Sequence, residues 1–220
     1  MRIHKAVLWL LLVGCGVSEE KAAPPETPSV AVAIAFEGSW GWLGNELYET
    51  SMRDWRYGAF QHLRVGIEAA FSELPPNAET AIIAYDATHP RIALSMGPVR
   101  PRSSTAMGQQ RDYEQNIASD LVRGVRMGLD ELAHSTAPRK ILIVVGSGSP
   151  IYLDKDPALL AALREEADRA GIDTVAIVLP TEYADEKPPA WAKTMVTVEH
   201  SWALVDQLRA HATRRTIAAR

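Results

Sequence analysis

SVAVAIAF, residues 29–36, is the stretch that decides the fold, because every residue after Ser29 in it is apolar. No polar residue alternates with the apolar ones, which predicts a β-strand that is buried on both faces. Such strands belong to parallel sheets that helices cover on both sides. The next residues, EGSWG at 37–41, place a carboxylate and a serine at the end of this strand. Because open α/β sheets bind ligands at the carboxyl ends of their strands, this turn is the first candidate site.

Helices and strands alternate along the rest of the chain. Apolar residues at helical spacing predict four helices, and Ser51, Asp156 and Ser201 are the predicted N-caps of the first, third and fourth. The fourth helix is expected to bury one apolar side made of Trp202, Val205, Leu208 and Ala212. Residues 97–115 are polar and contain Pro and Arg, which predicts a loop. Short apolar runs predict further strands at residues 80–85, 91–96, 140–145, 172–179 and 195–198.

The order of these elements gives the fold class. The strands at 80–85 and 91–96 are joined by the short sequence DATHP, so we expect a hairpin and one antiparallel strand at an edge of the sheet. The apolar strands that connect through helices are expected to be parallel, with right-handed crossovers. The sequence therefore predicts one α/β domain, with a doubly wound, mostly parallel sheet, one antiparallel edge strand and helices on both faces.

The first residues of the chain carry an export pattern. Arg2 and Lys5 accompany an apolar run at residues 6–13, which is too short to span a bilayer. The sequence LVGC at residues 12–15 resembles the bacterial lipoprotein signal, in which the peptidase cuts before the cysteine and the cysteine carries the acyl chains. The resemblance implies a signal peptide at residues 1–14 and lipid attachment at Cys15. A conventional cleaved signal peptide is the alternative.

Domain limits and location follow from this segment. Residues 15–28 are polar and contain Pro, which predicts a flexible linker between the lipid and the fold. The folded domain is expected over residues 29–215, and residues 216–220 form a C-terminal tail. Gly16 stands where the lipoprotein pattern has Asp for retention at the inner membrane. We therefore expect a lipid-anchored protein of the cell envelope, at the outer membrane, that faces the periplasm or the cell surface.

Composition excludes several classes of function. The formal net charge is −4, with 23 basic and 27 acidic residues, so no basic surface for nucleic acid is predicted. The six histidines are scattered and Cys15 is the single cysteine, a pattern that predicts neither a zinc site nor an internal disulfide. Contact with the membrane is expected through the lipid anchor only.

Three stretches are similar, in their order and spacing, to a known family. Residues 116–132 (NIASDLVRGVRMGLDEL) resemble the helix of that family's second motif, residues 140–145 (KILIVV) its central strand, and residues 170–179 its next strand. Over residues 29–215 the chain looks like a von Willebrand factor A-type domain. The resemblance implies this fold and a non-catalytic protein-binding or scaffold role.

The resemblance also locates a metal site. Members of the family hold one divalent cation with Asp-x-Ser-x-Ser after the first strand, a Thr before the middle helix and an Asp after the central strand. These positions fall on Glu37, Ser39, Gly41, Gln115 and Gly146. Magnesium needs near-octahedral oxygen coordination, and the two glycines offer no side-chain oxygen. We expect a degenerate site and no cofactor; weak binding of Mg²⁺ or Mn²⁺ at Glu37 and Ser39, in a metal-dependent adhesin, is the alternative.

Aromatic residues gather in the loops that follow the predicted strands. Because aromatic side chains are enriched at the centres of interfaces, these loops predict a surface that binds an envelope protein. The alternative is that Trp40 and Trp42 fold back and cover the core. The predicted surface consists of Trp40, Trp42, Tyr48, Tyr152 and Trp191.

An enzyme is the remaining hypothesis. Residues 37–41 are close to the G-x-S-x-G turn of hydrolases, and Ser39 with His200 and an acid would make a small periplasmic serine hydrolase. A nucleophile turn needs a helix directly after the serine, whereas the next predicted helix starts near Ser51. We therefore expect no catalysis.

Overall fold

The computed structural model of the chain describes residues 26–38, 50–86, 90–108, 120–146, 157–179 and 189–214, without the side chains of residues 50–58 and 157. Each predicted strand and helix has a counterpart. In chain order the elements are β1 (Ala31–Glu37), α2 (Thr50–Ser72), β2 (Glu79–Tyr85), β3 (Arg91–Pro98), the 3₁₀ helix η1 (Ser103–Met107), α3 (Leu121–Ala133), β4 (Lys140–Gly146), α4 (Pro157–Arg169), β5 (Ile172–Val178), β6 (Thr194–Thr197) and α5 (Ala203–Thr213).

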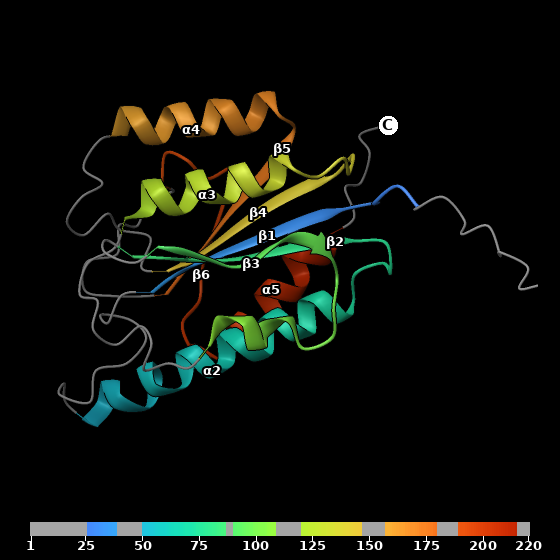
Figure 1. Cartoon of the computed structure of the whole chain (residues 1–220). Coiled ribbons are helices and arrows are strands. Elements are labelled where there is room, and N and C mark those ends of the chain that lie inside the picture. The colour runs from blue at the N-terminus through green and yellow to red at the C-terminus, as the bar shows by residue number, and fades with distance from the viewer. Residues whose placement is uncertain are drawn as a thin grey trace, which may run out of the picture.

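The strands form one sheet in the order β3-β2-β1-β4-β5-β6. The pair of β2 and β3 is antiparallel, and the other four pairs are parallel. Helices α3 and α4 lie on one face of the sheet, and α2 and α5 lie on the other (Figure 1). The prediction of a doubly wound sheet with one antiparallel edge strand is therefore confirmed.

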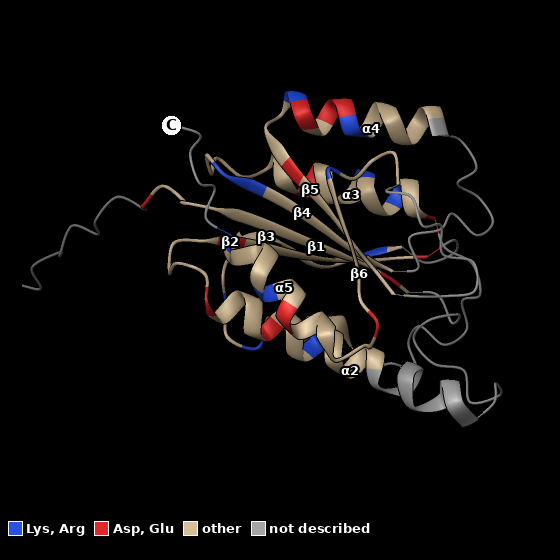
Figure 2. Cartoon of the chain, turned by 180° about the vertical axis from the view of Figure 1, so that it is seen from behind, with Lys and Arg blue, Asp and Glu red and all other residues tan. Residues whose placement is uncertain are grey.

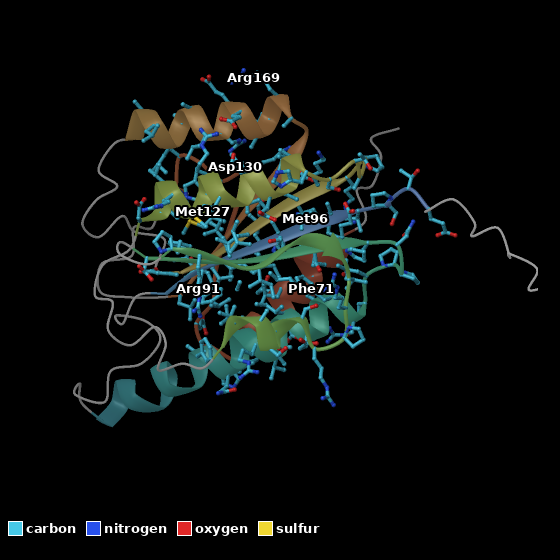
Figure 3. All side chains as sticks on the ribbon, viewed as in Figure 1. Phe71, Arg91, Met96, Met127, Asp130 and Arg169 are labelled. Atoms are coloured by element: carbon cyan, nitrogen blue, oxygen red, sulfur yellow. The ribbon has the colours of Figure 1, made fainter. Side chains whose placement is uncertain are left out.

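The central strand β1 divides the core into two layers. All seven of its residues are buried. Val32, Ile34 and Phe36 belong to the layer that α2 and α5 cover, whereas Ala33 and Ala35 belong to the layer under α3 and α4. In Figure 3, Phe71 lies in the first layer and Met127 in the second. This division follows from the alternation of side chains along a strand.

The apolar residues at helical spacing in α2 include Phe60, Leu63, Ile67 and Phe71, and all four are buried. The side predicted for α5 is wrong in part, since Trp202 is 58% exposed. The prediction that Ser201 caps this helix is also wrong. The Ser201 hydroxyl pairs with Nδ1 of His62 at 2.9 Å, and the helix begins only at Ala203. The buried residues of α5 are therefore Leu204, Leu208, His211 and Ala212.

Other boundaries differ from the prediction by a few residues. Helix α2 is already formed at Thr50, so Ser51 lies in its first turn and is not the residue before it. Asp120 caps α3, because its carboxylate accepts a hydrogen bond from the Arg123 amide at 2.9 Å. Asp156 lies outside the described residues, but α4 begins at Pro157, a position that suits proline.

The predicted loop at residues 97–115 contains the short helix η1, which the sequence pattern missed. Helix η1 is held against α2 by one side chain. The Glu68 carboxylate accepts hydrogen bonds from the amides of Arg102 at 3.0 Å and Ser104 at 2.5 Å. Such a contact joins residues far apart in the chain, so helical spacing alone cannot predict it.

Charged residues of both signs lie on the outer sides of the helices and at the ends of strands (Figure 2). Arg126 of α3 and Glu166 of α4 form an ion pair at 2.6 Å, with side chains 42% and 41% exposed. Water screens such a pair, which contributes at most about 1 kcal/mol. Within the described residues, no helix is both long enough and apolar enough to cross a membrane. Cys15 and the predicted linker up to residue 25 lie outside these residues.

Stability should depend on pH through His211. Burial and the nearby positive charge of Arg214 lower the pKa of this histidine, and its Nδ1 atom has no hydrogen-bond partner in the part of the chain that the structure describes. Above about pH 6.5 the imidazole is neutral in the folded and unfolded states. Below that pH the unfolded chain binds the proton first, so the free energy of unfolding falls as the pH falls toward the folded-state pKa.

The measurement is urea unfolding at about pH 7.5 and about pH 5.5. The loss of stability between them should be smaller in His211→Leu than in the wild type. His134→Leu is the control, because His134 is exposed. An equal loss in the wild type and His211→Leu would contradict the prediction.

Candidate functional site

The carboxyl ends of the parallel strands meet at one edge of the sheet, which we call the ligand edge. At this edge, Glu37 of β1 is paired with Tyr85 of the neighbouring strand β2. On the other side of β1, Phe36 is paired with Val145 of β4, so the next residues, Glu37 and Gly146, are also neighbours. Tyr85 belongs to the core layer under α3 and α4. Glu37 and Gly146 stand two residues after Ala35 and Val144 of the same layer, so all three residues form one row on that face of the sheet. The sequence predicted Glu37 and Gly146 as neighbours, and the structure brings them together.

Glu37 and Tyr85 occupy the space in front of Gly146. A methyl group at residue 146 would lie 2.6 Å from Oε2 of Glu37 and 2.7 Å from the hydroxyl oxygen of Tyr85. It would also lie 2.9 Å from Cβ of Glu37. These separations are below van der Waals contact, so residue 146 has to be glycine while Glu37 and Tyr85 keep their positions.

A second glycine fixes Tyr85 from the side of α3. A methyl group at Gly124 would lie 2.5 Å from Cγ of the Tyr85 ring. Helix α3 therefore approaches β2 closely, and the ring lies against the helix backbone. Glu37 and Tyr85 are 2% exposed, which places a carboxylate and a phenol together in a site with almost no contact to water.

Asp86 is a second buried carboxylate at the ligand edge, and the sequence analysis missed it. It follows Tyr85 directly and is 1% exposed. Neither Glu37 nor Asp86 lacks an interaction partner. The signal that could have found Asp86 was available, because it is a charged residue directly after the apolar run at 80–85, next to the first strand.

Of the five positions that the family resemblance assigns to a cation, Glu37 and Gly146 lie among the described residues of the ligand edge. Gly146 has no side chain to offer, and the Glu37 carboxylate fills the space where a side chain at residue 146 would begin. Among the described residues, no three His, Cys, Asp or Glu side chains converge to hold a metal ion. Ser39, Gly41 and Gln115 lie outside the described residues.

The aromatic surface needs one correction. Trp191 was predicted to bind a partner, but it is 1% exposed and belongs to the core layer under α3 and α4. Its large ring gains more from burial in this layer than from exposure, although its indole N–H has no hydrogen-bond partner among the described residues. The other members, Trp40, Trp42, Tyr48 and Tyr152, lie outside the described residues.

A different aromatic pair is exposed at this edge. The rings of His200 and Trp202 stack with centroids 5.9 Å apart and an angle of 22° between their planes. They follow β6, whose carboxyl end points the same way as that of β1, and Trp202 is 58% exposed. Helical spacing predicted Trp202 in the core, whereas the start of α5 at Ala203 leaves it outside the helix and exposed.

The positions of the strands do not favour the hydrolase hypothesis. His200 follows β6, and three strand spacings separate β6 from β1 in the sheet. At about 4.8 Å for each spacing, the two strand ends are about 14 Å apart. A Ser39–His200 pair would have to bridge that distance through loops.

Solved structures with the same fold share little sequence with this chain. A von Willebrand factor type A structure from Catenulispora acidiphila matches with a TM-score of 0.62 at 14% identity, over 84% of this chain and 42% of that chain. The VWA domain of SpRpn10 matches with a TM-score of 0.56 at 15% identity, over 80% and 94%. Mussel byssus protein PTMP1, with a zinc-occupied MIDAS motif, matches with a TM-score of 0.59 at 11% identity, over 84% and 48%.

This chain has a von Willebrand factor A-type fold, as the resemblance predicted. It spans less than half the length of the Catenulispora and mussel proteins. No protein-family model and no curated protein matches its sequence.

The contact of Glu37 with Gly146 can be tested by a double-mutant cycle. Gly146→Ala should lower the free energy of unfolding by about 1–3 kcal/mol, because the new methyl group overlaps Glu37 and Tyr85. In a Glu37→Ala background the same substitution should cost less, since the carboxylate is gone. Urea unfolding of the four proteins measures this coupling.

Gly97→Ala is the matched control, because a methyl group there meets only the Ser95 carbonyl oxygen at 3.9 Å. It should leave the stability nearly unchanged. If Gly146→Ala were as harmless as Gly97→Ala, the close packing of Glu37 against Gly146 would be wrong.

Proposed function

We propose that this chain is a lipid-anchored protein of the cell envelope whose von Willebrand factor A-type domain binds a partner protein, without catalysis and without the family's cation. The observation that carries the proposal is the row of Tyr85, Glu37 and Gly146 at the ligand edge. A carboxylate from β1 fills the space from which related domains present an Asp after the central strand. The fold and its ligand edge are present, and Gly146 offers no side chain there as a ligand for a cation.

The burial of the row supports a binding role over a catalytic one. A catalytic carboxylate has to reach a substrate, whereas Glu37 is 2% exposed and packed against a glycine and a tyrosine. Such a group belongs to the packing at the end of β1, where the chain leaves the sheet. The loop begins at Gly38, whose amide donates to the Tyr85 carbonyl at 2.6 Å.

The membrane anchor is supported by the sequence alone. The basic and apolar residues before Cys15 resemble a lipoprotein signal, and acyl chains on one residue supply about 0.8 kcal/mol for each buried CH₂ group. The linker of residues 15–28 joins the anchor to the first described strand. Gly16 favours the outer membrane, where the domain faces the periplasm or the cell surface.

The partner is proposed to bind at the ligand edge, where exposed aromatic rings are available. Trp202, stacked on His200, replaces Trp191 in the predicted surface, together with the loop residues Trp40, Trp42, Tyr48 and Tyr152. A tryptophan that is more than half exposed buries a large area when a partner covers it, at a small cost in side-chain entropy. We propose a protein of the same envelope compartment as the partner.

Divalent cations should leave the melting temperature of the chain unchanged. A cation that binds only the folded state raises this temperature by mass action, so titration of Mg²⁺, Mn²⁺ and Ca²⁺ against a chelated sample detects a working site. We expect no saturable shift, because Gly146 provides no ligand and Glu37 is packed.

Glu37→Gln is the control for this titration. A shift in the wild type that disappears in Glu37→Gln would contradict the proposal and would favour the metal-dependent adhesin. A shift that survives in Glu37→Gln would place a cation elsewhere in the chain.

Partner binding should depend on Trp202. In living cells that produce the full-length chain, Trp202→Ala should reduce the yield of covalent complexes formed by an amine-reactive crosslinker, because a central tryptophan contributes about 2 kcal/mol, or roughly 30-fold in affinity. Val65→Ala is the matched control, since Val65 is 55% exposed on α2.

Equal yields from Trp202→Ala and the wild type would contradict the assignment of this surface. Ser39→Ala should leave the yield unchanged. If purified chain hydrolysed a simple ester and Ser39→Ala removed that activity, the hydrolase hypothesis would replace the present one.

A further inference from the structure

A cavity of about 550 Å³ lies at the edge of the sheet opposite the ligand edge. Four segments line it: the start of β1 at Ser29 and Val30, the end of α2 at Glu73 and Leu74, the turn before β4 at Arg139, and the end of α5 at Thr213. Its volume is in the range of pockets that hold small organic ligands, about 300–1,000 Å³. None of these residues takes part in the site described above.

Arg139 is the one charged side chain of this lining without a counter-ion. Within the described residues it forms no ion pair, and its Nε atom is buried without a hydrogen-bond partner. Burial lowers the pKa of its guanidinium group. Asp173 provides some opposing charge, but its carboxylate is paired with Nζ of Lys193 at 3.3 Å. A partly buried cation without a hydrogen-bonded anion is costly, so an anion from outside would stabilise it.

The other polar groups of the lining are already engaged. The Glu73 carboxylate accepts a hydrogen bond from Nε of Arg209 at 2.8 Å, so its charge is balanced. The Ser29 hydroxyl donates to the side-chain oxygen of Asn77 at 2.8 Å, and the Thr213 hydroxyl donates to the Arg209 carbonyl at 2.7 Å. The guanidinium group of Arg139 is therefore the donor that remains for a ligand.

We propose that this cavity, the Arg139 pocket, binds the phosphate group of a small phosphate ester or of a phospholipid headgroup. The planar guanidinium fork matches the oxygens of a phosphate and can donate two hydrogen bonds to them. Val30 and Leu74 provide apolar surface beside the fork for the carbon atoms of the ligand. The half-buried Lys140, next to Arg139 in the sequence, adds positive charge at the same end of β4.

The position of the pocket relates it to the membrane. Ser29 lines the pocket, and the predicted linker ends one residue earlier, at residue 28. If Cys15 carries the lipid, the chain arrives from the membrane at this edge of the sheet, which then lies nearest the headgroups. This step rests on the proposed anchor, whereas the binding of a phosphate by Arg139 does not.

The test uses the full-length chain in a non-ionic detergent. Its melting temperature is measured during titration with glycerol phosphate, a soluble fragment of a lipid headgroup, and with chloride at the same ionic strength. At ten times the dissociation constant, mass action and the size of the domain give an expected rise of about 3–6 °C. Arg139→Gln should abolish this rise, and Arg139→Lys should keep part of it.

Arg123→Gln is the matched control, because Arg123 is an exposed arginine at the start of α3, near the opposite edge. It should show the same rise as the wild type. The proposal is overturned if glycerol phosphate acts no more strongly than chloride, or if Arg139→Gln keeps the full rise. If Arg139→Gln does not fold, Arg139→Lys takes its place. A full rise in melting temperature in Arg139→Lys, equal to that of the wild type, would then overturn the proposal.

Two further arms identify the source of the phosphate. Inorganic phosphate as effective as glycerol phosphate would indicate a site for free phosphate. Mixed micelles with phosphatidylglycerol that raise the melting temperature of the wild type, but not of Arg139→Gln, would indicate a lipid headgroup. Because the soluble arms do not involve Cys15, failure of the anchor and failure of the pocket give different results.

Discussion

The structure depends on the complete burial of β1. No residue of this strand reaches water, so both of its faces must be covered by helices and both of its edges must pair with other strands. A helical layer on each face requires the chain to cross the sheet on both sides, which gives the doubly wound order. The alanines at residues 31, 33 and 35 face the layer under α3 and α4, where helix α3 comes close to the sheet.

The same constraint shapes the ligand edge. Glu37 is the last residue of β1 and, like the rest of the strand, is buried between its neighbours. A buried carboxylate has to find hydrogen bonds and space, and Gly146 provides the space by having no side chain. Gly124 does the same for Tyr85 on the neighbouring strand. The two glycines thus give room for a packed polar site at the ends of β1, β2 and β4.

Much of the fold could be predicted because it rests on local patterns. Apolar runs and helical spacing mark every strand and helix of the sheet layers, and Gly171, with φ of +67°, follows the end of α4. The incorrect predictions concern features that depend on contacts between residues far apart in the chain. The Ser201 hydroxyl is taken by His62 of another helix, and η1 depends on Glu68 of α2. Neither partner is visible from the spacing of residues along one element.

The site was predictable only in part for the same reason. Glu37 and Gly146 follow from their position after apolar strands, but their contact depends on the order of β1 and β4 in the sheet. Trp191 and Trp202 show that the sequence does not distinguish a buried tryptophan from an exposed one. Both stand beside a strand or helix, yet their side chains are 1% and 58% exposed. Their difference follows from where α5 begins and from which loop crosses the core layer.

The two edges of the sheet have different surroundings, and this gives the molecule a direction. The ligand edge has the packed row of Tyr85, Glu37 and Gly146 and, after β6, the exposed Trp202 ring stacked on His200. The opposite edge has Arg139, which has no counter-ion among the described residues, and the predicted linker joins the fold there. A domain tethered at that edge would hold its aromatic rings away from the membrane, where a partner in the envelope can reach them. In this proposal the length of the strands would separate the tether from the binding surface, so each could change in sequence without disturbing the other.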